Sequence, residues 1–172
     1  MTGITTDGAG PADQPAPITV LSVGNTIMGD DGVGPAILAQ VMADRGHDPH
    51  ITYVEGGVRG LLNLPDVQDA HWLILLDAIA DPAPPGTILH LNGAELPHRL
   101  SSKKVSPHQV GLLDLLTSAR LIGDEPDRVE VVGVVPDQVD LSLELSPAVA
   151  AAVPEAAKLV SSILDGWLAE LE

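Results

Sequence analysis

Two adjacent acids, Asp30 and Asp31, lie in the segment VGNTIMGDDGVGP (residues 23–35), which follows an apolar run and contains four glycines. In many α/β proteins the loop after the first strand binds phosphate through bare backbone N–H groups, and two carboxylates would repel such an anion. The glycines also do not fit the G-x-G-x-x-G spacing of dinucleotide-binding loops. The segment therefore predicts a site for a cationic group.

A third acid, Asp77, comes at the end of the apolar run HWLILLDA (residues 71–78). If the strands follow the order 2-1-3, the carboxyl ends of the first and third strands are neighbours, about 5 Å apart at the backbone. Two carboxylates at such a short distance repel each other, and a bound cation commonly relieves this repulsion. In the simpler alternatives, Asp30 or Asp31 caps the next helix and Asp77 merely ends its strand. We predict different roles for the two adjacent acids: Asp30 caps the helix or supports the structure, and the side chain of Asp31 points inward.

His108 differs from the other histidines because it follows Pro107 and precedes a predicted helix. The helix dipole disfavours an imidazolium at that end, and a neutral imidazole is a competent metal ligand. A histidine at a helix start is nevertheless more often structural than a ligand. Asp31, Asp77 and His108 together form a nitrogen and oxygen set suited to a divalent transition metal with open positions. The remaining five histidines are expected to be structural or solvated.

The elements that must position these residues alternate between strand and helix. The sequence predicts an α/β fold, a three-layer sandwich in which a mostly parallel, twisted sheet of about five strands is flanked by helices on both faces. The strand that begins near Gly86 follows its predecessor without a helix, so it is expected to be antiparallel or at an edge. The predicted strands are 18–24, 51–55, 71–78, 86–92 and 128–135, and the predicted helices are 31–44, 60–67, 108–123 and 147–171, the last capped by Ser146.

The composition is that of one globular domain. The chain has 172 residues, 45% of them hydrophobic, and a formal charge of −16 from 24 acidic and 8 basic residues, which argues against nucleic-acid and anionic-membrane partners. The absence of cysteine excludes disulfides and thiol catalysis. No uninterrupted apolar run reaches the roughly 18 residues of a membrane span. We expect residues 1–16 to form a disordered tail and residues 17–172 to form a single domain.

Five segments, in this order, resemble the hydrogenase maturation endopeptidases, which cut a C-terminal extension from the large subunit of nickel–iron hydrogenase. The resemblance spans about residues 18–165. The segments are VGNTIMGDDGVGP, EGG (55–57), LLDAIAD (75–81), KKVSPHQVGLLDLL (103–116) and VVGVVPDQVDLSLELSPAV (131–149).

The resemblance implies that this chain is an endopeptidase whose nickel contacts come from Asp31, Asp77 and His108. In some relatives the second acid of GDDG is Glu rather than Asp. The nickel arrives with the substrate, held between its cysteine thiolates, so no tightly bound resident metal is expected. A water activated by the metal or by an acid would attack the peptide carbonyl.

The resemblance also suggests substrate-binding residues and a partner. Gly56 and Gly57 would let substrate backbone approach closely, with a plain turn as the alternative, and Asp30 is assigned to substrate binding as well. The expected partner is the precursor of a nickel–iron hydrogenase large subunit. The protein itself is expected to be a monomer in the cytoplasm. Two alternatives are a non-catalytic module that binds or delivers nickel and a related peptidase acting on another protein. Shortening of a nickel-loaded precursor would exclude the first alternative, and a hydrogenase large-subunit precursor encoded nearby would argue against the second.

Overall fold

The computed structural model describes residues 16–93, 95 and 107–172, apart from the side chains of residues 107–111 and 113. The predicted tail therefore lies outside the described residues except for residue 16. The elements agree closely with those expected from the sequence. They are the strands β1 (Ile18–Val23), β2 (Ile51–Gly57), β3 (Trp72–Ala78), β4 (Ile88–Asn92) and β5 (Arg128–Val134), the helices α1 (Val33–Arg45), α2 (Leu64–Gln68), α4 (Pro107–Ile122) and α5 (Pro147–Leu171), and the 3-10 turns η1 (Gly29–Gly32) and η2 (Gly60–Asn63).

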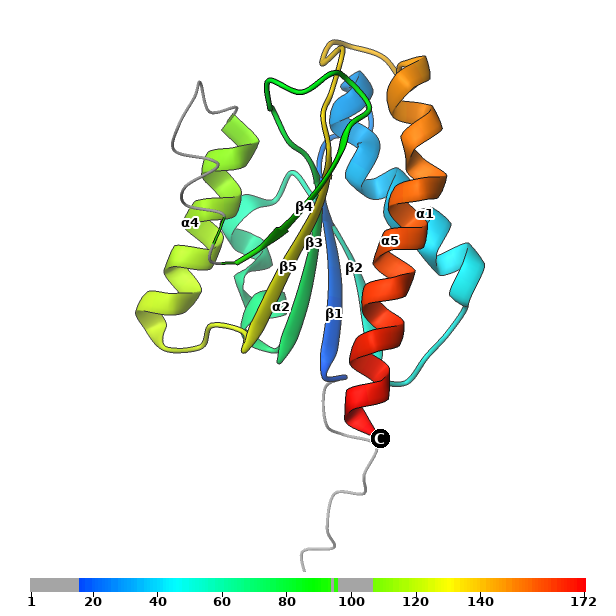
Figure 1. Cartoon of the computed structure of the whole chain (residues 1–172). Helices are drawn as coiled ribbons and strands as arrows, with labels where there is room; N and C mark the ends of the chain where they lie inside the picture. The colour runs from blue at the N-terminus through cyan, green and yellow to red at the C-terminus, as the bar shows by residue number, and fades with distance from the viewer. Residues whose placement is uncertain (1–15, 94, 96–106) are drawn as a thin grey trace, which may run out of the picture.

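The described strands form one twisted sheet in the order β2-β1-β3-β5-β4 (Figure 1). β1 pairs in parallel with β2 and β3, and β3 pairs in parallel with β5. β4 pairs antiparallel with β5 and lies at the edge, so both alternatives expected for this strand hold. β1 and β3, the strands that lead to the predicted acids, are neighbours as expected.

Helices cover both faces of the sheet, with α1 and α5 on one face and α2 and α4 on the other (Figure 1). The side chains of β3 alternate between these two layers. Ile74 and Leu76 pack in the cluster that contains the α1 and α5 side chains, whereas Leu73 and Leu75 pack with Leu115 of α4. A parallel strand buried on both faces needs apolar residues at successive positions. The predicted three-layer α/β sandwich is confirmed.

α5 is a core helix in this arrangement. It is long and apolar enough to cross a membrane by length and composition alone. Its side chains at Ala156, Val160 and Leu164 are buried against the sheet, as an amphipathic helix of a soluble fold requires. The fold is therefore of the soluble type.

A close approach between α1 and the sheet sets the position of the loop that carries the adjacent acids. A Cβ atom on Gly34, in the first turn of α1, would lie 2.5 Å from the Val23 carbonyl oxygen and 2.6 Å from that of Leu76. Glycine at this position lets α1 begin directly against the carboxyl ends of β1 and β3. The turn η1 is thereby held at the same edge.

Candidate functional site

Asp31 lies in η1, just beyond the end of β1, and its residue is only 3% exposed. The backbone N–H of Asn25 donates a hydrogen bond of 2.8 Å to Asp31 Oδ2. The loop between them folds back because Gly24 has a φ of +132°, and a Cβ atom there would overlap the Asp31 carbonyl oxygen. The glycines of the segment thus place a carboxylate at the edge of the sheet, as the inward-reaching role of Asp31 requires.

Asp77 is the second-last residue of β3 and is completely buried. By strand alternation its side chain belongs to the face of Leu73 and Leu75, which α2 and α4 cover. Its Oδ1 accepts a hydrogen bond of 2.8 Å from the N–H of Ala78, while its Oδ2 has no partner among the described residues. A buried carboxylate oxygen without a donor is costly, so Asp77 is more than the plain end of a strand.

The carboxylates of Asp31 and Asp77 act on each other at this edge. Burial, and then the neighbouring charge of Asp31, raise the pKa of Asp77 well above its ordinary value. The register agrees, because Ser22 of β1 lies opposite Leu76 of β3, the residue before Asp77, and the chain continues from β1 through residues 24–28 into η1, which contains Asp31. The two acids are therefore near enough for the charge of Asp31 to act on Asp77, and their role as a cation site stays a prediction. A cation bound between them would relieve their repulsion.

His108 is the second residue of α4, and its side chain lies outside the described residues. The backbone of α4 begins at the end of the molecule where β1 and β3 finish (Figure 1). Position 108 precedes Leu112 by one helical turn, and Leu112 packs on the same face of the sheet as Leu75. No group of three potential metal ligands occurs among the described residues, and the meeting of His108 with the two acids stays a prediction.

Asp30 has a different environment from its neighbour. Its Oδ2 accepts hydrogen bonds from the N–H groups of Asp137 and Gln138, both 2.9 Å, and from the Ser146 hydroxyl at 2.7 Å. Its Oδ1 accepts the Ser146 N–H at 2.7 Å. Burial opposes ionisation, but these hydrogen bonds outweigh it and lower the pKa of Asp30.

These contacts favour the supporting role for Asp30 and correct the local picture of capping. Neither η1 nor α1 receives a side-chain cap, and Asp30 instead binds the start of α5, far away in the chain. Ser146 is the N-cap residue of α5, as expected, but its hydroxyl donates to Asp30 rather than accepting a helix N–H. The assignment of Asp30 to substrate binding stays a prediction that these hydrogen bonds do not support.

Gly56 and Gly57 are the last two residues of β2, which extends two residues beyond the predicted end at residue 55. The register with β1 shifts at this point, which makes Gly56 the extra residue of a β-bulge. A Cβ atom on Gly56 would lie 2.6 Å from the Ser22 carbonyl oxygen, and Gly57 has a φ of +54°. Backbone geometry thus accounts for both glycines, and their contact with substrate stays a prediction.

Sequence reasoning missed a buried amide beside this bulge. Asn63, at the end of η2, is completely buried and its Nδ2 donates to the carbonyl of Gly56 at 3.3 Å. Its Oδ1 has no partner among the described residues. The available signal was a single amide within the apolar run LLNLP (residues 61–65).

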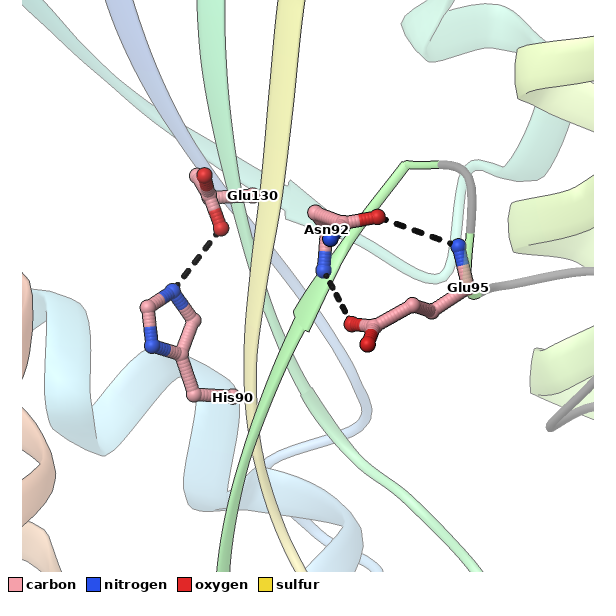
Figure 2. Close-up of polar contacts among 4 residues, drawn as sticks. All are labelled: His90, Asn92, Glu95 and Glu130. Atoms are coloured by element: carbon pink, nitrogen blue, oxygen red, sulfur yellow. Dashed lines mark hydrogen bonds and ion pairs between the residues drawn. The ribbon is translucent and has the colours of Figure 1, made fainter.

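Another polar group lies at the edge of the sheet formed by β4. His90 Nε2 is 2.8 Å from Glu130 Oε2 on the neighbouring strand, and the N–H of Asn92 donates 3.0 Å to Glu95 Oε2 (Figure 2). The N–H of Glu95 returns a bond of 3.2 Å to Asn92 Oδ1. His90 is a solvent-exposed cross-strand partner, as expected for a structural histidine.

Comparisons with known proteins agree on one family. A family model described as hydrogenase maturation protease matches residues 36–163. The chain is 33% identical over 148 residues to the hydrogenase 2 maturation protease of Escherichia coli strain K12, covering 86% of this chain and 90% of that protein. It is 30% identical over 158 residues to the hydrogenase expression/formation protein HupD of Rhodobacter capsulatus, covering 91% and 75%.

Solved structures with the same fold carry matching descriptions. The hydrogenase maturating endopeptidase HybD from Escherichia coli superposes with a TM-score of 0.79 at 32% identity, over 87% of this chain and 92% of that one. The [NiFe] hydrogenase maturation protease HybD from Thermococcus kodakarensis gives a TM-score of 0.71 at 25% identity, over 85% and 97%.

Proposed function

The chain belongs to the hydrogenase maturation protease family, and we propose that it removes the C-terminal extension of a [NiFe] hydrogenase large-subunit precursor after nickel has been inserted. It is accordingly a peptidase, a peptide-bond hydrolase. The observation that carries the proposal is the pair of buried carboxylates, Asp31 and Asp77, at the carboxyl edge of the sheet.

We propose that the metal recognised by this pair is the nickel of the substrate. Thiolates of the precursor bind nickel strongly, so the enzyme only has to complete the coordination with oxygen and nitrogen donors. Asp31 and Asp77 would supply the oxygens and His108 the nitrogen. The unpartnered Oδ2 of Asp77 supports this role, since a cation there would satisfy a buried oxygen that the described protein groups leave unpaired. The enzyme needs no tightly bound metal of its own.

Hydrolysis requires that a water lose a proton and that the leaving amine gain one. The water oxygen adds to the peptide carbonyl carbon, the carbon–nitrogen bond breaks, and the amine takes the proton. The raised pKa of Asp77 describes the site before the substrate arrives, since nickel at its Oδ2 would favour the ionised carboxylate. A nucleophilic cysteine is excluded, since the chain contains none.

Incubation of the enzyme with nickel-loaded precursor, followed by mass spectrometry of the intact products, tests the proposal. We expect a shortened large subunit and a released C-terminal peptide, with no change in precursor that lacks nickel. A precursor that binds the enzyme but keeps its mass would instead identify a nickel-binding or delivery module.

The source of the metal needs a separate measurement. Purified enzyme should contain less than a stoichiometric amount of metal, and dialysis against a chelator should leave its activity on nickel-loaded precursor intact. Zinc-loaded enzyme that cleaves nickel-free precursor at a comparable rate would contradict recognition of substrate nickel and indicate an ordinary metallopeptidase.

We also propose that the enzyme works as a monomer in the cytoplasm. The soluble type of fold and the strongly acidic composition support this environment. Light scattering of the purified chain gives the oligomeric state, and fractionation of the native cells gives the compartment. A stable dimer or a membrane-bound enzyme would contradict the corresponding part.

A further inference from the structure

Four large apolar side chains are exposed beside the candidate site, and we call them the loop patch: Ile27, Val139, Leu141 and Leu143. Their exposed fractions are 48%, 50%, 81% and 83%. Ile27 belongs to the loop between β1 and η1, and the other three belong to the segment between β5 and α5. A cluster of large apolar side chains with such high exposed fractions is unusual on the surface of a monomeric protein.

Backbone hydrogen bonds bring the two segments of the loop patch together. Met28 and Ser142 form a parallel β-bridge. The N–H of Ser142 donates 3.0 Å to the Ile27 carbonyl, and the N–H of Gly29 donates 2.9 Å to the Ser142 carbonyl. Leu141 and Leu143 flank the bridging residue, so these contacts set them beside Ile27.

Hydrogen bonds to Asp30 fix both ends of the segment that carries three of the loop-patch residues. Asp30 binds the N–H groups of Asp137 and Gln138 before the patch residues and the N–H of Ser146 after them. Asp30 also donates its own N–H to the Gln138 carbonyl at 2.9 Å. Folding therefore orders an exposed apolar segment instead of burying it, which suits a preformed binding surface.

Acidic residues alternate with the patch. Asp140 lies between Val139 and Leu141, and Glu144 follows Leu143, all of them exposed. A partner that fits this pattern presents an apolar surface edged by basic groups. Because Ile27 is only four residues from Asp31, this partner would lie over the candidate metal-recognition site.

We propose that the loop patch docks the folded body of the hydrogenase large-subunit precursor, on an apolar surface with basic residues at its border. This inference rests on the proposed function and adds a recognition surface to it. Docking at the loop patch holds the precursor while its nickel reaches Asp31 and Asp77. Binding and chemistry are thereby assigned to different side chains.

The test compares two double variants in steady-state cleavage of nickel-loaded precursor. L141S/L143S removes the centre of the loop patch. L121S/I122S is the matched control, because Leu121 is also 83% exposed but lies at the opposite end of α4 from the sheet edge that carries the acids (Figure 1). We expect L141S/L143S to lower kcat/KM at least tenfold through KM with kcat within twofold, and the control to match wild type.

Charge provides a second, independent readout. Added salt should lower the kcat/KM of wild type, and D140N/E144Q should weaken this salt dependence. If serine at the patch disturbs folding, which circular dichroism would reveal, L141A/L143A replaces it with the same expectation.

The outcomes separate the two proposals. If wild type shortens no nickel-loaded precursor, the proposed function fails and docking fails with it. If wild type cleaves and L141S/L143S has the same KM, docking at the loop patch is wrong while the proposed function stands. A wild-type dimer that L141S/L143S converts to a monomer with unchanged cleavage would identify a second copy as the occupant and overturn the inference.

Discussion

Replacing Asp30 by alanine should loosen the loop that joins β5 to α5. The substitution removes the acceptor of four hydrogen bonds, three from backbone N–H groups and one from the Ser146 hydroxyl. Hydrogen bonds to a charged group contribute about 1.5–3 kcal/mol each. These donors are only partly buried, so water recovers some of the loss, and the alanine no longer has to desolvate a charge. We therefore expect a loss of about 3–4 kcal/mol in the free energy of unfolding, near 1 kcal/mol per bond.

Urea unfolding measures this loss through intrinsic fluorescence. Trp72 and Trp167 pack edge to face in the core, with ring centroids 5.6 Å apart, and report global unfolding. The expected loss corresponds to a fall in Tm of roughly 6–16 °C for a chain of this size. Asp44→Ala is the matched control, because Asp44 is exposed and, among the described residues, its side chain accepts a single hydrogen bond, 2.9 Å from Gln40 Nε2. It should change stability by less than about 0.5 kcal/mol.

The dependence on pH gives the reasoning a sharper test. Because the pKa of Asp30 is lowered on folding from its ordinary value of 3.8, its stabilisation is present above that value. It is lost as the pH falls through the lowered folded pKa. The stability difference between wild type and Asp30→Ala should therefore shrink in acid. A loss below about 1 kcal/mol at neutral pH would refute the assignment of Asp30 as the anchor of this loop.

Three further predictions concern the sheet edge. Asp31→Ala, Asp77→Ala and His108→Ala should each retain the fold by circular dichroism but give no detectable precursor shortening by mass spectrometry; a single variant with normal activity would remove its residue from the site. Asp77→Asn should be more stable than wild type at neutral pH, and the gain should vanish toward pH 3.8, because the raised pKa makes ionised Asp77 unfavourable for folding only above the unfolded value; a pH-independent difference in urea unfolding would contradict this. Gly34→Ala should lose about 2–3 kcal/mol through overlap with two carbonyl oxygens, whereas Gly166→Ala on α5, with no atom within 4 Å of its added Cβ, should be neutral or stabilising; equal Tm values for the two variants would contradict the close approach of α1.

The layers of the fold were predictable because the central strands β1 and β3 are buried on both faces and each long helix is buried on one. The run LILL in β3 and the spacing of Val33, Ile37 and Val41 in α1 each admit few other structures. The end of β2 was placed at residue 55, two residues early, because the bulge at Gly56 depends on the β1 backbone beside it. The strand predicted from residue 86 begins at Ile88 because Gly86, with a φ of +85°, still belongs to the preceding turn.

The part of the candidate site whose position depends on the ends of neighbouring strands was predictable from the sequence. Asp31 and Asp77 come together because β1 and β3 are neighbours, a relation that follows from the order of strands and helices. The environment of Asp30 was not predictable, since its partners lie 107 to 116 residues away in a loop without periodicity. The burial of Asn63 likewise depends on a contact with the bulge of β2.

Asp30 and Asp31 show how one dipeptide can supply two opposite electrostatic environments. Asp30 meets four donors, which lower its pKa and fix it as an anion that binds the chain together. Asp31 instead adds negative charge to the surroundings of Asp77, whose Oδ2 has no donor among the described residues. The proposed function requires the two carboxylates to stay together before a cation binds, and their repulsion favours local opening of the fold. The hydrogen bonds of Asp30 oppose that tendency from the adjacent residue, so η1 can place Asp31 near Asp77 and at the same time anchor the segment of the loop patch.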